Sequence, residues 1–324
     1  MALTTDRRPA PTSAQAASEG PPTSWFARLK RDWGLLVFAV PGLLVFLIFH
    51  YVPLLGNVIA FKDYQPYLGI QQSPWVGLSN FSLIFSGDPE VLNALKNTLI
   101  LTVLQVAFVF PAPIILALVL NSLLYEPIKR VVQSVLYMPH FLSWVIVVAI
   151  FQQILGNAGL LNTYLRQKGL EPIEIIGNPD AFRALITSQV IWKDTGWGTI
   201  LFLAALSRVD QQQYEAAAVD GASPMRQLWH VTLPALRPLI ILLGILRLGD
   251  SLSVGFEQIL LQQGAGTEVT EVLDTYVYHH AFQQGEWGVS AAVGLVKGLI
   301  GLALVLGANK VAHLFGEDGV YRTR

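Results

Sequence analysis

The chain has 324 residues, of which 53 % are hydrophobic and only 13 % are charged, and its mean hydropathy is +0.50. A soluble protein carries about 25 % charged residues, so this composition argues against an ordinary soluble enzyme. The net charge of −1 argues against a nucleic-acid-binding chain, and the absence of cysteine excludes disulfides, thiol catalysis and Cys-based metal sites. The sequence therefore predicts an all-α membrane protein.

The N-terminal part of the chain is expected to stay outside the membrane. Residues 1–24 are rich in Pro, Ser, Thr and Ala and have no apolar period, so we expect a disordered cytoplasmic segment over residues 1–33. The apolar stretch that follows is long, and no small-residue cleavage pattern closes it. It therefore predicts a retained helix and not a signal peptide.

Six stretches are apolar enough to cross a bilayer, which takes about 20 residues of helix. The predicted spans are residues 34–53, 98–121, 132–155, 184–206, 236–256 and 289–309. Charged residues interrupt the fifth, and two prolines (Pro111 and Pro113) predict a kink in the second. We expect a transmembrane domain over residues 34–310, followed by a cytoplasmic tail over 311–324.

The basic residues between the spans set the expected orientation. Thirteen Lys and Arg residues lie in the N-terminal segment, in alternate loops and in the tail, against five in the other loops. Basic residues concentrate on the cytoplasmic side of a membrane protein. This asymmetry predicts that both termini are cytoplasmic and that the number of spans is even.

The cytoplasmic loop over residues 211–234 has the pattern of two short helices. The first helix is expected to end at Asp220-Gly221, because glycine suits the left-handed backbone position after a helix. Ser223 is a good N-cap and Pro224 a good first residue for the second helix. The apolar residues of this second helix share one face, and we expect Pro234 to end it: they are Met225, Leu228, Trp229 and Thr232.

Taken alone, this loop is either an amphipathic linker on the membrane surface or a docking element for a soluble partner. A resemblance favours the second alternative. The order Glu215-Ala216-Ala217, Asp220-Gly221-Ala222 and Leu233-Pro234 resembles the EAA loop of permease subunits of bacterial ABC importers. Further stretches resemble the branch of that family that imports oligosaccharides, including aldouronate and alginate oligomers: residues 75–81, 97–99, 137–144 and 191–197.

The resemblance covers roughly residues 30–320 and implies a type I ABC importer permease fold in the bacterial cytoplasmic (inner) membrane. It implies several partners beside the membrane lipid: a second, homologous permease in a heterodimer, an ATPase subunit dimer and an extracytoplasmic solute-binding protein. ATP and Mg²⁺ are then expected on the ATPase and no cofactor on this chain. The residues expected to couple the chain to the ATPase are Glu215, Ala216, Ala217, Asp220, Gly221, Met225, Leu228 and Trp229.

Charged residues inside the last three predicted spans are the second feature of interest. Such residues are costly in the membrane and usually face a cavity or a partner. They either pair with each other, as Arg247 could with Asp250 three residues later, or line a polar substrate passage. The candidates for such a passage are Trp192, Lys193, Arg247, Asp250 and Lys297.

The charges of this group predict an acidic substrate. Together with Asp194, the spans hold three cations and two anions, and a polyuronate needs positive charge to compensate its carboxylates. Arg247 is the best candidate for direct contact, since a guanidinium can engage a carboxylate at two points. Trp192 and Trp197 flank Lys193-Asp194; aromatic faces suit sugar rings, although tryptophan near a span end is also a common interfacial anchor.

Catalytic and metal-binding motifs are missing from the sequence. There is no phosphate-binding GxxxxGK[S/T] loop, no HExxH and no GxSxG, and the six histidines are scattered apart from the doublet His279-His280. We therefore expect neither an enzyme nor a metal site. The alternative to an importer subunit is a self-sufficient secondary transporter or channel that uses Asp194 and Asp250 for ion coupling, which would leave the loop over 211–234 without a role.

Overall fold

The computed structural model describes residues 33–123, 125–314, 316 and 319–321. Almost the whole predicted disordered segment, residues 1–32, lies outside these residues. The described chain is helical, and an isolated antiparallel bridge between Lys62 and Trp75 is its sole extended pairing. It divides into two compact units, residues 1–56 and residues 57–324.

The described part of the first unit is one apolar helical segment. It runs through α2 (Trp33–Phe46), a π-helical turn (Leu47–Tyr51) and α3 (Val52–Leu55). Its large apolar side chains are exposed, Phe38 at 87 % and Leu55 at 74 %. A helix that is apolar on all sides needs lipid or another protein around it, so this segment agrees with the first predicted span.

The second unit holds the remaining helices. Between residues 57 and 121 these are α4 (Gly69–Gln72), α5 (Ser82–Phe85), α6 (Pro89–Leu104) and α7 (Pro111–Asn121). The middle of the chain forms α8 (Glu126–Tyr137), α9 (Trp144–Leu155), α10 (Leu160–Gln167), α11 (Pro179–Leu206), α12 (Gln211–Val219), α13 (Pro224–Gln227) and α14 (Leu233–Gly249). The last part forms α15 (Phe256–Leu260), α16 (Thr267–Thr270), α17 (Leu273–Tyr278) and α18 (Trp287–Leu314).

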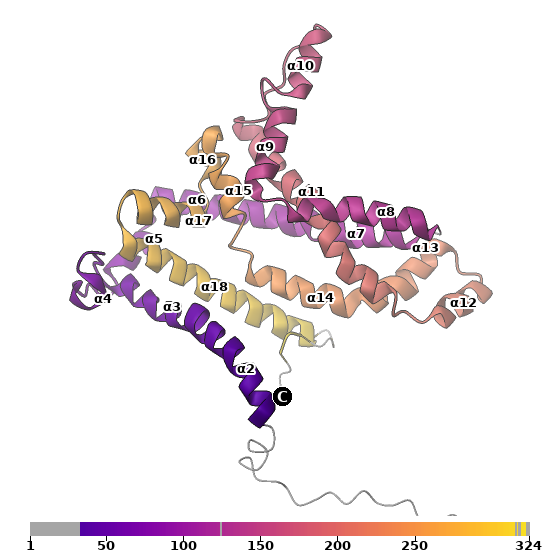
Figure 1. Ribbon diagram of the computed structural model, residues 1–324, viewed down its shortest axis with the longest axis horizontal. Coiled ribbons are helices and arrows are strands. Elements are labelled where there is room, and N and C mark those ends of the chain that lie inside the picture. The colour runs from indigo at the N-terminus through magenta and orange to yellow at the C-terminus, as the bar shows by residue number, and fades with distance from the viewer. Residues whose placement is uncertain (1–32, 124, 315, 317–318, 322–324) are drawn as a thin grey trace, which may run out of the picture. The chain divides into compact units, whose positions relative to one another are not determined.

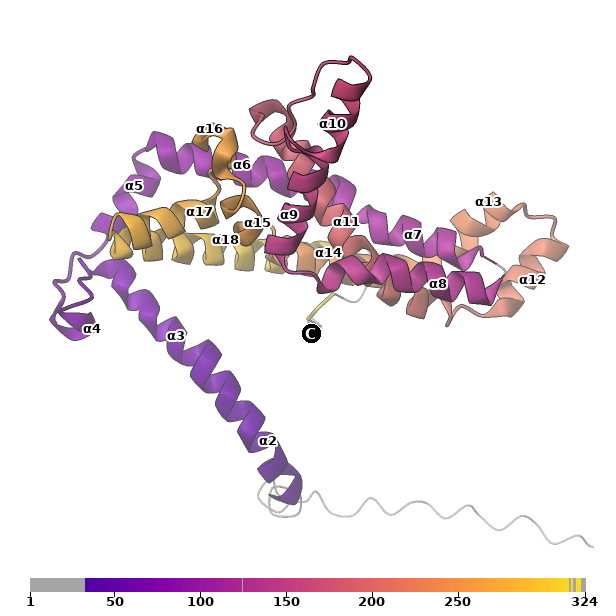
Figure 2. The same ribbon diagram turned by 45° about the horizontal axis from the view of Figure 1, so that its top comes forward.

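Within the second unit, α6 continues into α7, and α14 lies beside α18 (Figures 1 and 2). The helix α11 packs along α7, and buried residues of α7, α11 and α14 form one apolar cluster that includes Ala117, Phe202 and Leu236. A second cluster joins α6 and α11 to the segment after α14 through Leu101, Ile186 and Ile259. The helices α12 and α13 lie at one end of this bundle, and α5 lies at the other.

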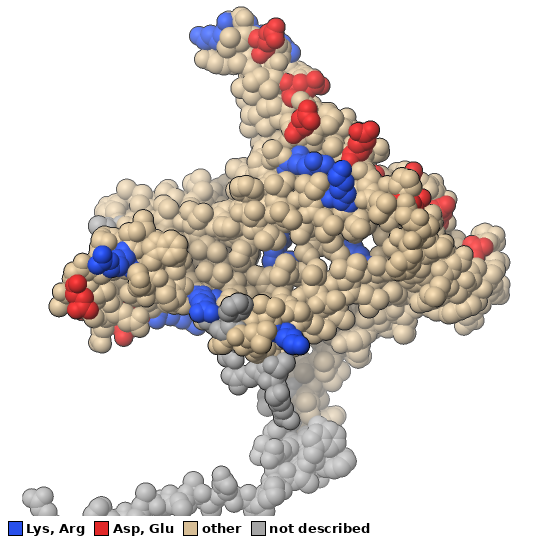
Figure 3. Space-filling view, turned by 180° about the vertical axis from the view of Figure 1, so that it is seen from behind, with Lys and Arg blue, Asp and Glu red and all other residues tan. Residues whose placement is uncertain are grey.

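The surface of the second unit carries few charges along the helices. On the face drawn in Figure 3, acidic and basic side chains gather on the protrusion that contains α10, whereas broad areas over the bundle are uncharged. Among the described residues, five helical segments are long and apolar enough to cross a membrane: Leu36–Phe61, Pro89–Asn121, Trp144–Gln167, Pro224–Gly249 and Trp287–Leu314.

The fourth predicted span, 184–206, lies inside α11, which is not one of these five segments. This helix has 28 residues, about 42 Å at 1.5 Å per residue, so its length is sufficient. Its composition is more polar than that of the five segments, since it includes Gln189, Lys193 and Thr199. These three side chains are buried within the unit. The six-span count therefore stays a prediction, as do the cytoplasmic termini.

The third predicted span, 132–155, was wrong as a single helix. The chain breaks between α8 and α9, with a 3₁₀ turn over Met138–Phe141, and Ser143 caps the start of α9 by accepting a hydrogen bond from the backbone N–H of Ile146. Hydropathy does not detect the break, because the end of α8 over residues 132–137 contains no charged residue and merges with the apolar α9, although the start of α8 carries Glu126, Lys129 and Arg130. Pro139 and the N-cap serine are the local signals for it.

The fifth span was wrong at both ends. Helical backbone runs without interruption from Pro224 to Gly249, so Pro234 does not end the loop helix. A π-helical turn over Leu228–Thr232 precedes this proline; widened turns of this kind accommodate a residue that lacks an N–H. A similar turn over Gln105–Val109 precedes Pro111, where we expected a kink.

At its C-terminal side the fifth span stops at Gly249, and residues 250–255 are not helical. The sixth span is longer than expected, since α18 extends to Leu314 and takes up the first four residues of the predicted tail. The described tail folds back onto this helix. The buried amide of Asn309 pairs with the backbone N–H and C=O of Tyr321 at 3.1 and 3.2 Å.

Candidate functional site

The loop over residues 211–234 folds as a short helix, α12, that a tight turn joins to α13, the first turn of the continuous helix Pro224–Gly249. Asp210 caps α12 by accepting a hydrogen bond from the N–H of Gln212 at 3.0 Å. Gly221 follows the helix with φ +75°. The N–H of Gly221 donates to the carbonyl of Ala218 at 3.0 Å, and that of Ala222 donates to Ala217 at 2.9 Å. This pair of bonds is the Schellman arrangement, which favours glycine at the left-handed position.

The side chains of this loop divide into anchors and exposed groups. The Tyr214 hydroxyl lies 3.0 Å from that of Thr232, which ties α12 to the start of the long helix. Met225 and Trp229 are 63 % and 62 % exposed, and Leu228 is half-buried. The acidic residues expected to make contacts, Glu215 and Asp220, are exposed, as is Ala216, whereas Ala217 is half-buried.

Lys193 lies at the break between α8 and α9. Its amine donates to the backbone carbonyls of His140 and Leu142 at 2.6 and 2.7 Å, and the residue is 8 % exposed. The carboxylate of Asp194 lies 3.0 Å from Nδ1 of His140. The adjacent pair thus holds the non-helical turn that ends α8, because these carbonyls have no partner within a helix.

The two tryptophans beside this pair pack against other rings. Trp197 stacks on His140 with the ring centroids 4.7 Å apart and the planes nearly parallel. Trp192 meets Phe151 edge-on at 5.8 Å. Both are partly exposed, at 47 % and 41 %.

Arg247 does not pair with Asp250 as one of our alternatives assumed. Its guanidinium donates to the side-chain oxygen of Gln105, which is buried at the start of the π-helical turn that precedes α7. This bond connects α14 to the α6–α7 segment across the bundle. Asp250 is exposed and lies just beyond the end of α14.

Asp250 and Lys297 share a cavity of about 610 Å³ between α14, α17 and α18. The amine of Lys297 forms an ion pair with the carboxylate of Asp274, and the two side chains are 16 % and 23 % exposed. Four glycines line the cavity: Gly249, Gly294, Gly298 and Gly301. A Cβ added at Gly294 or Gly298 would meet open space, so these two glycines leave the cavity wide. Sequence reasoning found Asp250 and Lys297 but missed Asp274, because the pairing joins positions 23 residues apart.

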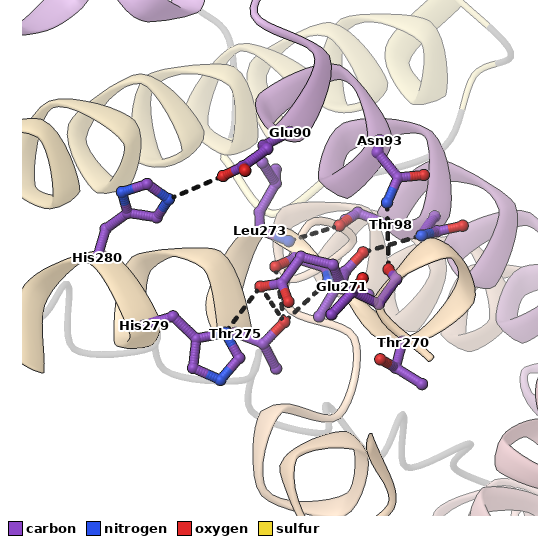
Figure 4. A network of polar contacts seen from close by, with 12 residues as sticks. Glu90, Asn93, Thr98, Thr270, Glu271, Leu273, Thr275, His279 and His280 are labelled. Atoms are coloured by element: carbon purple, nitrogen blue, oxygen red, sulfur yellow. Dashed lines mark hydrogen bonds and ion pairs between the residues drawn. The ribbon is translucent and has the colours of Figure 1, made fainter. Parts of the chain in front are cut away.

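A polar network fixes the segment between α14 and α18 to α6 (Figure 4). The Asn97 amide donates to the carbonyls of Glu268 and Glu271 at 2.8 and 3.0 Å, and its oxygen accepts from Arg183 at 3.1 Å. The Glu271 carboxylate accepts from the Thr275 hydroxyl at 3.0 Å and lies 3.2 Å from Nδ1 of His279. No sequence pattern we used detects this network.

Next to the network lies Tyr276, which is 2 % exposed and stacks on His280 at 3.9 Å. Burial, and the negative charges of Asp88, Glu286, Glu90 and Glu271, raise the pKa of Tyr276 to about 12. The tyrosine is therefore neutral at physiological pH. Among the described residues, no group of three or more His, Asp or Glu side chains is arranged to hold a metal ion.

These features define a class: a multi-pass helical membrane protein with a helix–turn–helix at one end of its bundle and a polar cavity between α14, α17 and α18. The comparisons with known proteins give the family. Residues 109–314 match the binding-protein-dependent transport system inner membrane component family, and the chain belongs to it. It is therefore a permease subunit of an ABC importer in the inner membrane, and the ATPase is a separate subunit.

The relatives and solved structures agree with this assignment. The chain is 47 % identical to Protein LplB of Bacillus subtilis (strain 168), over 97 % of this chain and 99 % of that protein. It is 48 % identical to the polygalacturonan/rhamnogalacturonan transport system permease protein YteP of the same organism, over 89 % and 90 %. A crystal structure of a bacterial ABC transporter that imports the acidic polysaccharide alginate matches with a TM-score of 0.82 and 35 % identity, covering 90 % of this chain and 99 % of that one.

The fold and the transport role expected from the EAA-type loop are confirmed by these matches. A crystal structure of a bacterial alginate ABC transporter in complex with an alginate pentasaccharide-bound periplasmic protein also matches, with a TM-score of 0.82 and 34 % identity. Family membership sets aside the alternative of a self-sufficient secondary transporter.

Proposed function

We propose that this chain forms one half of the translocation pathway for an acidic oligosaccharide. The other half is a second, homologous permease, and a solute-binding protein delivers the sugar from outside. An ATPase dimer binds ATP and Mg²⁺, and the loop over residues 211–234 docks onto this dimer.

The loop geometry is the observation that carries the coupling role. The Gly221 turn and the Tyr214–Thr232 contact both fix α12 to the continuous helix Pro224–Gly249, which begins with α13. Met225 and Trp229 stay exposed beside this rigid frame. Large apolar residues on a rigid support are usual anchors of a protein interface, and a rigid unit can transmit a displacement of the ATPase.

The substrate class is supported by the relatives. One transports polygalacturonan or rhamnogalacturonan and another imports alginate, and both kinds of polymer contain uronic acids. The three cations that we counted inside the spans support it less than we expected. Lys193 is bonded to backbone carbonyls, Arg247 to Gln105, and Lys297 to Asp274. We therefore assign Lys193 and Trp192 to packing and keep Arg247, Asp250 and Lys297 as substrate-path residues.

The test uses the assembled complex in lipid vesicles. The tagged chain is co-expressed with its partner permease and ATPase, and ATPase activity is measured with the solute-binding protein and a panel of sugars: oligoalginate, oligogalacturonate and neutral arabino-oligosaccharides. We expect the ATPase to co-purify and the acidic oligomers to stimulate it. The neutral oligomers are the matched control.

Two results contradict the proposal at different points. Uptake of sugar by this chain alone, without an ATPase, contradicts the importer role. Equal stimulation by neutral and acidic oligomers contradicts only the substrate class. Loss of ATPase recovery in Trp229→Ala, with normal insertion of the chain, supports the loop as the docking element.

A further inference from the structure

An aromatic hollow lies next to the cavity that holds Lys297. It has a volume of about 540 Å³ and is lined by Phe256, Asp274, Val277, Tyr278 and Phe282. The rings of Phe256 and Tyr278 lie 5.6 Å apart, and those of Tyr278 and Phe282 lie 5.3 Å apart. Phe282 is 67 % and Phe256 36 % exposed, and Tyr278 is half-buried between them, so none of the three rings belongs to the buried core. They form an open aromatic wall.

The two hollows adjoin, because Asp274 and Val277 line both of them. On one side of Asp274 are aromatic rings; on the other are Lys297, its ion-pair partner, and Asp250. Asp274 lies in α17 and Lys297 in α18, and these two helices pack against each other. The aromatic hollow lies in the segment that the distribution of basic residues assigns to the outer side, and the polar cavity continues along α18 towards the tail.

The chemistry of this pair of hollows suits a chain of sugar rings. A sugar residue presents C–H groups on one face, which the negative face of an aromatic ring attracts. Its hydroxyl groups both donate and accept, so they can bond to the carboxylates of Asp250 and Asp274 and to the Lys297 amine. Sugar rings can therefore stack on the side chains of the aromatic hollow and form hydrogen bonds with the charged groups of the polar cavity.

We propose that the aromatic hollow and the polar cavity form one oligosaccharide track that is joined at Asp274. This inference rests on the proposed function and assigns the residues that meet successive sugar units. Phe282 and Tyr278 stack the outer units. Asp274 binds hydroxyl groups at the junction and also neutralises Lys297 while no substrate is present, since an unpaired buried cation is costly.

The Asp274–Lys297 pair also sets how strongly a uronate is held. A substrate carboxylate must compete with Asp274 for the Lys297 amine, so acidic units bind weakly enough to leave. Each site along a transport pathway must bind the substrate strongly enough for it to enter and weakly enough for it to leave. Removing the charge of Asp274 while keeping its shape frees Lys297 for the substrate.

The first test of the track is the dependence of uptake on substrate length. The wild-type complex and Phe282→Ala are compared in vesicles with oligogalacturonates from disaccharide to tetrasaccharide. Loss of one stacked ring weakens binding by about three- to ten-fold. We expect KM to rise by that factor for the tetrasaccharide and to change little for the disaccharide, which fits in the polar cavity. Phe85→Ala, which changes an exposed phenylalanine of α5 (78 %, against 67 % for Phe282), is the matched control.

The second test is the preference between acidic and neutral sugars. Asp274→Asn should raise the uptake of oligogalacturonate at low concentration several-fold relative to neutral arabino-oligosaccharides. The Asp274→Asn/Lys297→Gln double variant should remove this gain. Yield and thermal stability of the complex are measured for each variant, so that a folding defect is seen directly.

Three results overturn the track. One is an equal change of KM at every length in Phe282→Ala. Another is an unchanged acidic-to-neutral ratio in Asp274→Asn. The third is a loss of partner permease from the Phe282→Ala complex without any length effect, which makes the aromatic wall a subunit contact. A wild-type complex that imports none of these sugars overturns the proposed function and the track together.

Discussion

Replacing Lys193 by methionine separates its two possible roles. Methionine keeps most of the length and apolar packing of the side chain but cannot donate the two hydrogen bonds to His140 and Leu142, at 2.6 and 2.7 Å. Hydrogen bonds to a charged group contribute about 1.5–3 kcal/mol each. Because both carbonyls lie at a partly exposed turn, where water can replace part of the loss, we expect a destabilisation of about 3 kcal/mol.

The assay is thermal unfolding of the purified complex, followed by tryptophan fluorescence, together with uptake of oligogalacturonate at a permissive temperature. A loss of this size should lower the Tm by several degrees and leave the ratio of acidic to neutral uptake unchanged. Lys168→Met, at an exposed lysine beyond α10, is the control and should change neither quantity. A normal Tm with lost uptake of acidic sugars would refute the reasoning and make Lys193 a substrate contact.

Three further changes test other parts of the structure. Gly221→Val should reduce transport strongly while the chain still inserts, because a β-branched residue is strained at φ +75°. Gly264→Val, at a glycine with open space around it, is the control. Equal transport in both variants contradicts the coupling role. Arg247→Gln should lose uptake, and adding Asp250→Asn should not restore it, since Arg247 is bonded to Gln105 and not to Asp250. Recovery of uptake in the double variant, measured in the same vesicles, would show that the two side chains form a pair and would end the idea that Arg247 contacts the substrate. Asn97→Leu should lower the Tm by more than Asn93→Ala. Asn97 is the hydrogen-bond partner of two backbone carbonyls and of the Arg183 guanidinium, whereas Asn93 is the partner of one carbonyl. Equal Tm values contradict the anchoring role of Asn97.

The local parts of the fold follow from the sequence. The turn at Gly221 and the restart at Ser223-Pro224 were predicted from residues within a few positions of each other, and the helices end and begin there, although the Ser223 side chain makes no capping hydrogen bond. Helix caps and left-handed glycines depend on neighbouring backbone groups alone. For this reason the loop is the best-predicted part of the candidate site.

The errors arose where distant parts of the chain decide the structure. The break between α8 and α9 is held by Lys193, about 50 residues away. The bond of Arg247 reaches across 142 residues to Gln105, whereas the sequence suggested the nearby Asp250. Hydropathy and helical spacing carry no information on such contacts, since they describe only short windows of the chain.

The unbroken helix from Pro224 to Gly249 gives the molecule a lever. Its 26 residues span about 39 Å at 1.5 Å per residue. Trp229 lies near one end, and Asp250 follows the other. A small tilt imposed on the exposed end therefore shifts the cavity wall at the far end sideways, as long as the π-helical turn within the helix does not bend. How much of the displacement at the exposed end reaches the cavity wall then depends on the stiffness of the π-helical turn over Leu228–Thr232, and not on the strength of any single contact.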